Sequence, residues 1–126
     1  MGKVIAEPNI TECWKANGNM NIVFVLTYVV KYEKRTEFQI LVKRFLKFKK
    51  ENPKAFEGLK FWRLFQREYG GVAGSYVEMW ECKSLEELDE VTARMLKHKE
   101  MMEIDIEFHK LIDHTTFTQS IWNTVA

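Results

Sequence analysis

Three groups of side chains in this sequence could do chemistry, and the first is the histidines. His98, His109 and His114 all fall within or just after one predicted helix. His98 and His109 are eleven residues apart, which is about three helical turns, so one metal ion cannot be bound by both. From the residues alone, the simplest interpretation is three ordinary, partly exposed histidines.

The second group is formed by charged residues on predicted strands that also carry aromatics: Arg63, Arg67 and Glu78. Buried charges need partners, and an Arg–Glu pair across two neighbouring strands would satisfy that need. The functional alternative is an arginine that binds a carboxylate or enolate of a substrate. If the interior is hollow, these are the polar groups that we expect to face the ligand.

The third group is aromatic: Tyr28, Trp62, Tyr76, Trp80 and Trp122. Such residues could line a pocket for an aromatic or lipid-like ligand. They also dominate ordinary cores and subunit interfaces, so packing is the competing interpretation. A cavity bordered by some of them is compatible with both.

Other chemistries find no support in the sequence. It contains no phosphate-binding loop, paired-glycine fingerprint, nucleophile elbow or zinc motif. A basic stripe could bind nucleic acid, but the strand beginning at Lys60 lacks the glycines of RNA-binding sheets, so no nucleic-acid partner is predicted. The stripe consists of Lys43, Arg44, Lys47, Lys49 and Lys50.

Charge is divided between two blocks of the chain. Residues 31–67 hold twelve Lys/Arg against four Asp/Glu, and residues 68–113 hold five against twelve. Opposite charges of similar size within a small domain indicate two neighbouring surfaces that complement each other. The net charge of +1 by itself favours no particular partner.

Hydrophobic periodicity predicts the elements that position these residues. Ile22 to Tyr32 is apolar on both faces, which is typical of a central strand. Thr36 with Gln39, and Ser84 with Glu87, have the form of capping boxes and predict the starts of two helices. The first helix should end at Asn52-Pro53, and the second should run to about Ile112 with a break near 97–101. Further strands are predicted at 60–69, 76–82 and 115–125.

The resulting order, β-α-β-β-α-β, is that of an α+β ferredoxin-like fold: an antiparallel four-stranded sheet with both helices on one face. We assign residues 1–21 to an N-terminal arm and 22–126 to this domain. The face without helices would expose a large apolar patch. We therefore expect a homodimer in which two sheets pack face to face, with a higher oligomer as a further option.

Location is inferred from composition. The longest apolar run, Ile22–Val30, is too short to span a membrane, and the N-terminus lacks the apolar core of a signal peptide. Cys13 and Cys82 form neither a disulfide framework nor a metal motif. A reduced, cytoplasmic protein without a membrane partner is the simplest interpretation.

The run Tyr76-Val77-Glu78-Met79-Trp80-Glu81-Cys82-Lys83-Ser84-Leu85-Glu86-Glu87 resembles the strand-to-helix joint of the dimeric α/β-barrel superfamily. Its NIPSNAP-like and antibiotic-biosynthesis-monooxygenase-like branches are the most similar. The resemblance implies a dimer with a cavity between sheet and helices or inside the barrel. Known functions in the superfamily include cofactor-free oxygenation, haem breakdown, decarboxylation and small-ligand binding, so the fold does not decide the function.

Haem is a specific possibility that the resemblance raises. Haem-degrading relatives carry a histidine midway along the second helix, which would make His98 a haem ligand or proton relay. They also use an asparagine in the first strand and a tryptophan in the second helix. Here the strand offers only Asn21 at its edge, and residues 84–113 contain no tryptophan. No cofactor is therefore predicted.

The sequence as a whole favours a small homodimeric protein that binds an apolar or aromatic small molecule. The predicted ligand-binding residues are Tyr28, Trp62, Arg67, Tyr76, Glu78 and Trp80. An alternative is a cofactor-independent monooxygenase or related lyase, with His98 or Arg63 as the catalytic group beside an aromatic pocket. A second alternative is a structural or interaction protein whose barrel is filled by side chains.

Overall fold

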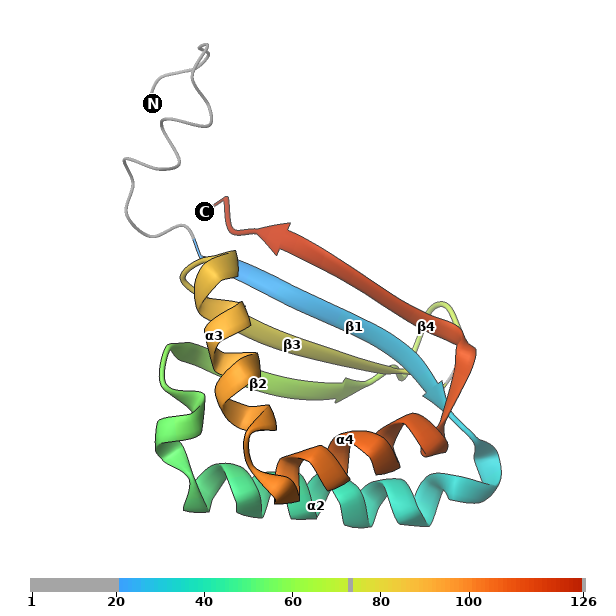
Figure 1. The fold of residues 1–126 in the computed structure, drawn as a ribbon. Coiled ribbons are helices and arrows are strands. Elements are labelled where there is room, and N and C mark those ends of the chain that lie inside the picture. Colours follow the sequence, from blue (N-terminus) through green and yellow to red (C-terminus); the bar gives the residue numbers. More distant parts are fainter. Residues whose placement is uncertain (1–20, 73, 126) are drawn as a thin grey trace, which may run out of the picture.

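Strand β1 (Ile22–Val30) lies inside a four-stranded antiparallel sheet with the order β2-β3-β1-β4 (Figure 1). The computed structural model describes residues 21–72 and 74–125. β1 pairs with β3 (Tyr76–Cys82) on one side and with β4 (Ile112–Asn123) on the other. β2 (Leu59–Gln66) forms the far edge beside β3. The prediction of a central first strand is confirmed, and its two apolar faces follow from this position.

Three α-helices cover one face of this sheet (Figure 1): α2 (Arg35–Glu51), α3 (Leu85–Leu96) and α4 (Lys99–Leu111). Short 3₁₀ turns, η1 (Tyr32–Lys34) and η2 (Pro53–Phe56), flank α2. The predicted second helix is thus two helices, and the chain breaks at 97–98 within the expected interval. The α+β ferredoxin-like fold predicted from the element order is confirmed.

The two predicted capping boxes have different outcomes. At the start of α3, the Ser84 side chain accepts a hydrogen bond from the Glu87 backbone N–H at 3.2 Å. At the start of α2, the N-cap residue is Lys34 and no side chain caps the helix. The Thr36 prediction is wrong because η1 leads directly into α2, which places Thr36 inside the helix rather than at its boundary.

Strand boundaries also differ from the predicted ones. β2 ends at Gln66, three residues before the predicted Tyr69, and the loop that follows contains Gly70 and Gly71 with positive φ. β4 begins at Ile112, directly after α4, rather than at Thr115. Ile112 pairs with Val30, so the sheet takes up the chain as soon as the helix ends.

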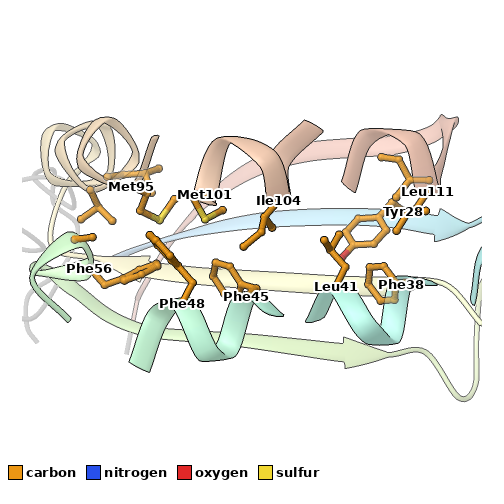
Figure 2. Packing of buried hydrophobic residues seen from close by; sticks show 14 of the residues in the cluster. Tyr28, Phe38, Leu41, Phe45, Phe48, Phe56, Met95, Met101, Ile104 and Leu111 are labelled. Atoms are coloured by element: carbon orange, nitrogen blue, oxygen red, sulfur yellow. The ribbon is translucent and has the colours of Figure 1, made fainter. Parts of the chain in front are cut away.

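The hydrophobic core lies between the helices and the sheet (Figure 2). Side chains at helical spacing on α2 point toward α4 and the sheet, as their periodicity predicts. The buried residues of this layer include Tyr28, Phe38, Leu41, Phe45, Phe48, Met101, Ile104 and Leu111.

Complementary charge joins the two adjacent helices. Arg44 on α2 donates from Nε to Glu100 Oε2 at 2.6 Å and from Nη2 to Glu103 Oε1 at 2.8 Å. Both acceptors lie on α4. The predicted neighbourhood of a basic and an acidic surface is confirmed, and Arg44 is engaged within the protomer.

Of the predicted arm, only Asn21 lies within the described residues. Its Nδ2 donates to Glu81 Oε2 at 2.5 Å, and its backbone oxygen accepts a hydrogen bond from Thr124 N–H at 3.0 Å. Asn21 is thus attached to the sheet. Residues 1–20, including Cys13, lie outside the described part of the chain.

Candidate functional site

A cavity of about 540 Å³ lies between the helices and the sheet. The sheet side of the cavity is formed by residues of one parity, since alternate side chains of a strand point to the same face. These residues are Phe24, Leu26 and Tyr28 on β1, Trp62 and Leu64 on β2, Glu78 and Trp80 on β3, and Phe117, Gln119 and Ile121 on β4. The cavity is therefore apolar over most of its sheet side, with one carboxyl group.

The helices supply the opposite side of the cavity. α2 contributes aromatic and aliphatic side chains, and α3 and α4 contribute apolar residues together with polar ones. Because the chain breaks between α3 and α4, the two helices run in different directions across the sheet (Figure 1). The lining residues on the helices are Phe38, Leu41, Val42, Phe45, Leu85, Leu88, Asp89, Thr92, Met95, Leu96, Met101, Ile104, Asp105, Phe108 and His109.

Glu78 is the buried polar group of this cavity, with 9% of its surface exposed. Trp62 Nε1 and Trp80 Nε1 both donate to its Oε1, at 3.2 and 3.0 Å. Tyr28 Oη donates to its Oε2 at 2.6 Å. Each donor comes from a strand position of the same parity, so sheet register alone brings the three around the carboxyl group.

Burial and the hydrogen bonds act on Glu78 in opposite directions. Burial raises the pKa of Glu78 above its ordinary value, and the hydrogen bonds from Tyr28, Trp62 and Trp80 offset part of that rise. The pKa of Tyr28 is raised as well, first by burial and then by the adjacent Glu78 carboxyl. Tyr28 therefore stays protonated and donates, while burial favours the protonated form of Glu78.

Polar residues also border the cavity where α3, α4 and β4 approach one another. Asp89 lies on α3, Asp105 and His109 on α4, and Gln119 on β4. Asp105 Oδ1 lies 3.6 Å from His109 Nε2, and both side chains are nearly half exposed. We call these four residues the polar rim. Sequence reasoning missed the rim, although the i,i+4 spacing of Asp105 and His109 is a signal that could have indicated the pair.

Four of the predicted ligand-binding residues line the cavity: Tyr28, Trp62, Glu78 and Trp80. Tyr76 does not line the cavity, but its ring packs against two residues that do, at 6.0 Å from the Tyr28 ring and 4.7 Å from the Phe38 ring. Parity accounts for this grouping, because these strand residues all point to the helix-covered face.

The two predicted arginines lie elsewhere. Arg63 pairs in register with Met79, so it points to the opposite face from Glu78, where its guanidinium lies over the Phe61 ring. Arg67 follows the end of β2 and donates from Nε to Ser75 Oγ at 2.8 Å. The expected Arg–Glu pair is therefore wrong, because strand alternation and strand length separate the arginines from Glu78.

His98 is also distant from the cavity. It occupies the N-cap position of α4, and its ring packs 5.2 Å from the Phe48 ring beside a separate polar hollow. The expectation that His98 stands beside the aromatic pocket does not fit this position, because the helix break places it at a helix end. Trp122 likewise points away from the cavity and is 53% exposed.

Two features are absent from the described residues, 21–72 and 74–125. They contain no group of three or more His, Cys, Asp or Glu side chains arranged to hold a metal ion. In the same residues, no helix is both long and apolar enough to cross a membrane.

Comparison with known proteins places the fold. No protein-family model matches the sequence, and no curated protein matches it. Solved structures do match: a conserved protein from Methanosarcina mazei Go1 is 20% identical, with a TM-score of 0.63 over 86% of this chain and 96% of that one. A NIPSNAP family protein from Agrobacterium tumefaciens is 19% identical, with a TM-score of 0.63 over 80% of this chain and 90% of its own.

A third structure adds a statement about assembly. A protein from Bacteroides fragilis, described as dimeric, of unknown function and with a ferredoxin-like fold, is 8% identical, with a TM-score of 0.57 over 82% of this chain and 96% of that one. The protein thus has the ferredoxin-like fold found in NIPSNAP proteins, as the resemblance at the strand-to-helix joint predicts. At these identities the comparisons establish the fold and leave the function to the site.

Proposed function

We propose that this protein binds an apolar or aromatic small molecule in the cavity between sheet and helices, and does so as a homodimer. The observation that carries the proposal is a cavity of about 540 Å³ lined mostly by aromatic and aliphatic side chains around the single buried carboxyl of Glu78. Small-molecule sites are typically concave, mostly apolar and supplied with a few oriented polar groups. The cytoplasmic location inferred from the sequence stays a prediction.

The size of the cavity argues against a filled interior. Native cores are packed about as densely as organic crystals, and voids larger than a water molecule are few. The space between the helices and the sheet is instead open to solvent on one side, so a ligand can reach the aromatic side chains that line it. Ligand binding recovers the contacts that the lining side chains lack.

The homodimer is supported by the other face of the sheet. All three α-helices of the described chain lie on one face, and the opposite face carries Phe61, Phe65, Met79 and Trp122. Phe65 is 44% and Trp122 is 53% exposed in the protomer. A patch of this kind is typical of an interface, and a second copy of the same face offers matching apolar side chains. The Bacteroides fragilis protein with the same fold, which is described as dimeric, supports a second copy of the chain as the partner on this face.

Binding is tested with N-phenyl-1-naphthylamine, an uncharged apolar probe whose fluorescence rises on leaving water. We expect saturable binding to the purified protein. Leu26→Trp places a larger side chain in the cavity and should reduce the probe's affinity at least tenfold. Ile106→Trp is the matched control, because Ile106 is 56% exposed on α4 and does not line the cavity. Absence of probe binding, or equal loss in both variants, would contradict the proposal.

A second candidate function, cofactor-independent oxygenation or a related lyase reaction, is favoured by one observation. Glu78 is a buried carboxyl with a raised pKa that faces the cavity, which is the state of many general bases. Both reactions can begin with removal of a proton from an acidic C–H of the bound substrate. In this proposal Glu78 takes the role that the sequence suggested for His98 or Arg63, and Tyr28 positions its carboxyl group.

The proton-transfer step can be measured without knowing the substrate. The α-protons of 2-tetralone, an apolar bicyclic ketone, exchange with deuterium in D₂O, and NMR follows their loss. We expect the protein to accelerate the exchange above the buffer rate, and Glu78→Gln to remove the acceleration. Glu90→Gln is the control, because Glu90 is exposed on α3 and does not line the cavity. Equal exchange with wild type and Glu78→Gln would exclude Glu78 as the base.

A further inference from the structure

We infer that the cavity selects apolar ligands that carry a protonated amine and disfavours ligands that carry a carboxylate. The inference deepens the proposed function and rests on it, since it concerns which molecule occupies the same cavity. It is carried by the charges, the hydrogen-bond directions and the aromatic rings of the lining.

The charged lining residues are almost all acidic. Glu78 lies on the sheet side, and Asp89 and Asp105 lie on the helix side. No lysine or arginine is among the residues that line the cavity, and the one histidine, His109, is paired with Asp105. A ligand carboxylate would therefore lack a cationic partner and would face like charge in a partly dehydrated space.

The hydrogen bonds around Glu78 also favour a ligand that donates hydrogen bonds. The indole N–H groups of Trp62 and Trp80 and the hydroxyl of Tyr28 are all committed to Glu78. Oε1 accepts two of these bonds and Oε2 accepts one. A ligand ammonium beside Glu78 favours the ionised carboxylate, and in that form Oε2 keeps one acceptor position, because each carboxylate oxygen can accept two hydrogen bonds. The sheet side of the cavity thus offers an acceptor to a donating ligand and offers no uncommitted donor to an accepting one.

Aromatic rings surround the approach to this carboxyl group. The Phe45 ring lies 4.9 Å from the Trp62 ring and 5.9 Å from the Trp80 ring, and the two indoles are 6.2 Å apart. These rings give the apolar body of a ligand an aromatic surface beside the carboxyl group, while the N–H edges of both indoles are directed at Glu78. An ammonium group on an apolar body would meet this aromatic surface and the carboxyl together.

The rim reinforces the selection before binding. Asp89 and Asp105 both belong to the polar rim, where the negative charge of solvent-accessible carboxylates attracts cations and repels anions. A cation that passes the rim then reaches Glu78. The effect of the rim should weaken with salt, whereas that of the buried Glu78 should weaken much less.

The experiment compares three naphthalene probes of matched size by titration calorimetry at pH 7. They are 2-(1-naphthyl)ethylamine, 2-(1-naphthyl)ethanol and 1-naphthylacetate, which present a cation, a neutral group and an anion. We expect the amine to bind roughly tenfold or more tightly than the alcohol, since charge-assisted hydrogen bonds are about twice as strong as neutral ones. The acetate should bind most weakly.

Two variants separate the contributions. Glu78→Gln keeps an acceptor for the indoles and removes the charge, so the preference for the amine over the alcohol should fall to a few-fold or less. The double variant Asp89→Asn/Asp105→Asn changes only rim residues and should reduce the preference modestly and mainly at low salt. It also guards against misfolding of Glu78→Gln, because Asp89 is exposed and Asp105 is only half-buried.

The outcomes are distinguishable. If the alcohol or the acetate binds as tightly as the amine, charge selection is overturned while the apolar binding site stands. If none of the three probes binds, the proposed function itself fails. If the amine preference is unchanged in Glu78→Gln and in the rim variant, the selection does not arise from these carboxyl groups and the inference is wrong.

Discussion

The two faces of the sheet carry similarly apolar side chains and meet different surroundings. One face presents Phe24, Trp62 and Trp80, and α-helices cover it. The other presents Phe65 and Trp122, which the described part of the protomer leaves substantially exposed. Strand alternation makes both faces of the sheet apolar. The packing of the helices buries one face, which forms the core and the cavity, and leaves the other exposed in the protomer.

The largest effect should come from a core residue on the helix side. Phe45 is 7% exposed and packs against Phe56, Trp62 and Trp80, so Phe45→Ala should lower the free energy of unfolding by about 3–5 kcal/mol. Urea denaturation followed by circular dichroism measures the loss. The matched change on the other face, Phe65→Ala, should cost less at low protein concentration. Equal losses would show that the two faces are equally buried.

The next effect should appear in assembly rather than in folding. Trp122→Glu places a charge at the exposed apolar face, and we expect dimerisation to weaken by about 2 kcal/mol or more, as for a central interface tryptophan. Sedimentation velocity over a concentration series measures the change. Ile40→Glu is the control, because Ile40 is 62% exposed on α2. A wild-type protein that stays monomeric at high concentration would contradict the proposal that this face is a dimer interface.

A pH-dependent effect should single out the buried carboxyl. Burial raises the pKa of Glu78 in the folded protein above its ordinary value near 4.5. Between these two values the folded state holds more protons than the unfolded state, so this group lowers stability as pH rises through that window. Glu78→Gln removes the ionisation, and its stability relative to wild type should increase from pH 4.5 upward.

Denaturation of both proteins at a series of pH values from 4.5 to 8 measures this difference. Asp89→Asn serves as the comparison, since Asp89 is an exposed lining residue. A constant difference between Glu78→Gln and wild type across the range would show that Glu78 has no raised pKa in the folded protein.

The smallest effect concerns the ends of the covering helices. Ser84 accepts the Glu87 N–H at the start of α3, so Ser84→Ala should cost about 1 kcal/mol. Thr36 has the same sequence signature but caps nothing, so Thr36→Ala should change stability by only a few tenths of a kcal/mol. Thermal or urea unfolding of the pair measures both. A larger loss for Thr36→Ala would contradict the assigned helix starts.

Much of the fold and part of the site could be predicted from the sequence. Alternation along β1 placed Tyr28 on one face with Phe24 and Leu26, and the element order assigned β1 and β3 to a common sheet. The Asp105–His109 pair at the rim was missed because its approach to the sheet depends on where α3 ends and α4 turns. Local patterns carry no information about that crossing.

The arginines illustrate a feature of the site that the sequence could not predict. Arg63 and Glu78 lie on neighbouring strands, and their charges invite a pair, but the register sets Arg63 opposite Met79 and Leu64 opposite Glu78. A shift by one residue reverses the face of every side chain on a strand, so pairing requires the register to be known. Two indoles and a phenol satisfy Glu78 instead.

The element order, the apolar character of both sheet faces and the complementary charges of the helices could be read from the sequence, because they follow from local periodicity and composition. The cavity under the helices, the burial of Glu78 within it and the positions of His98 and Arg63 outside it became known from the three-dimensional structure. Those outcomes depend on strand register and helix direction, which are set by long-range packing of the whole chain.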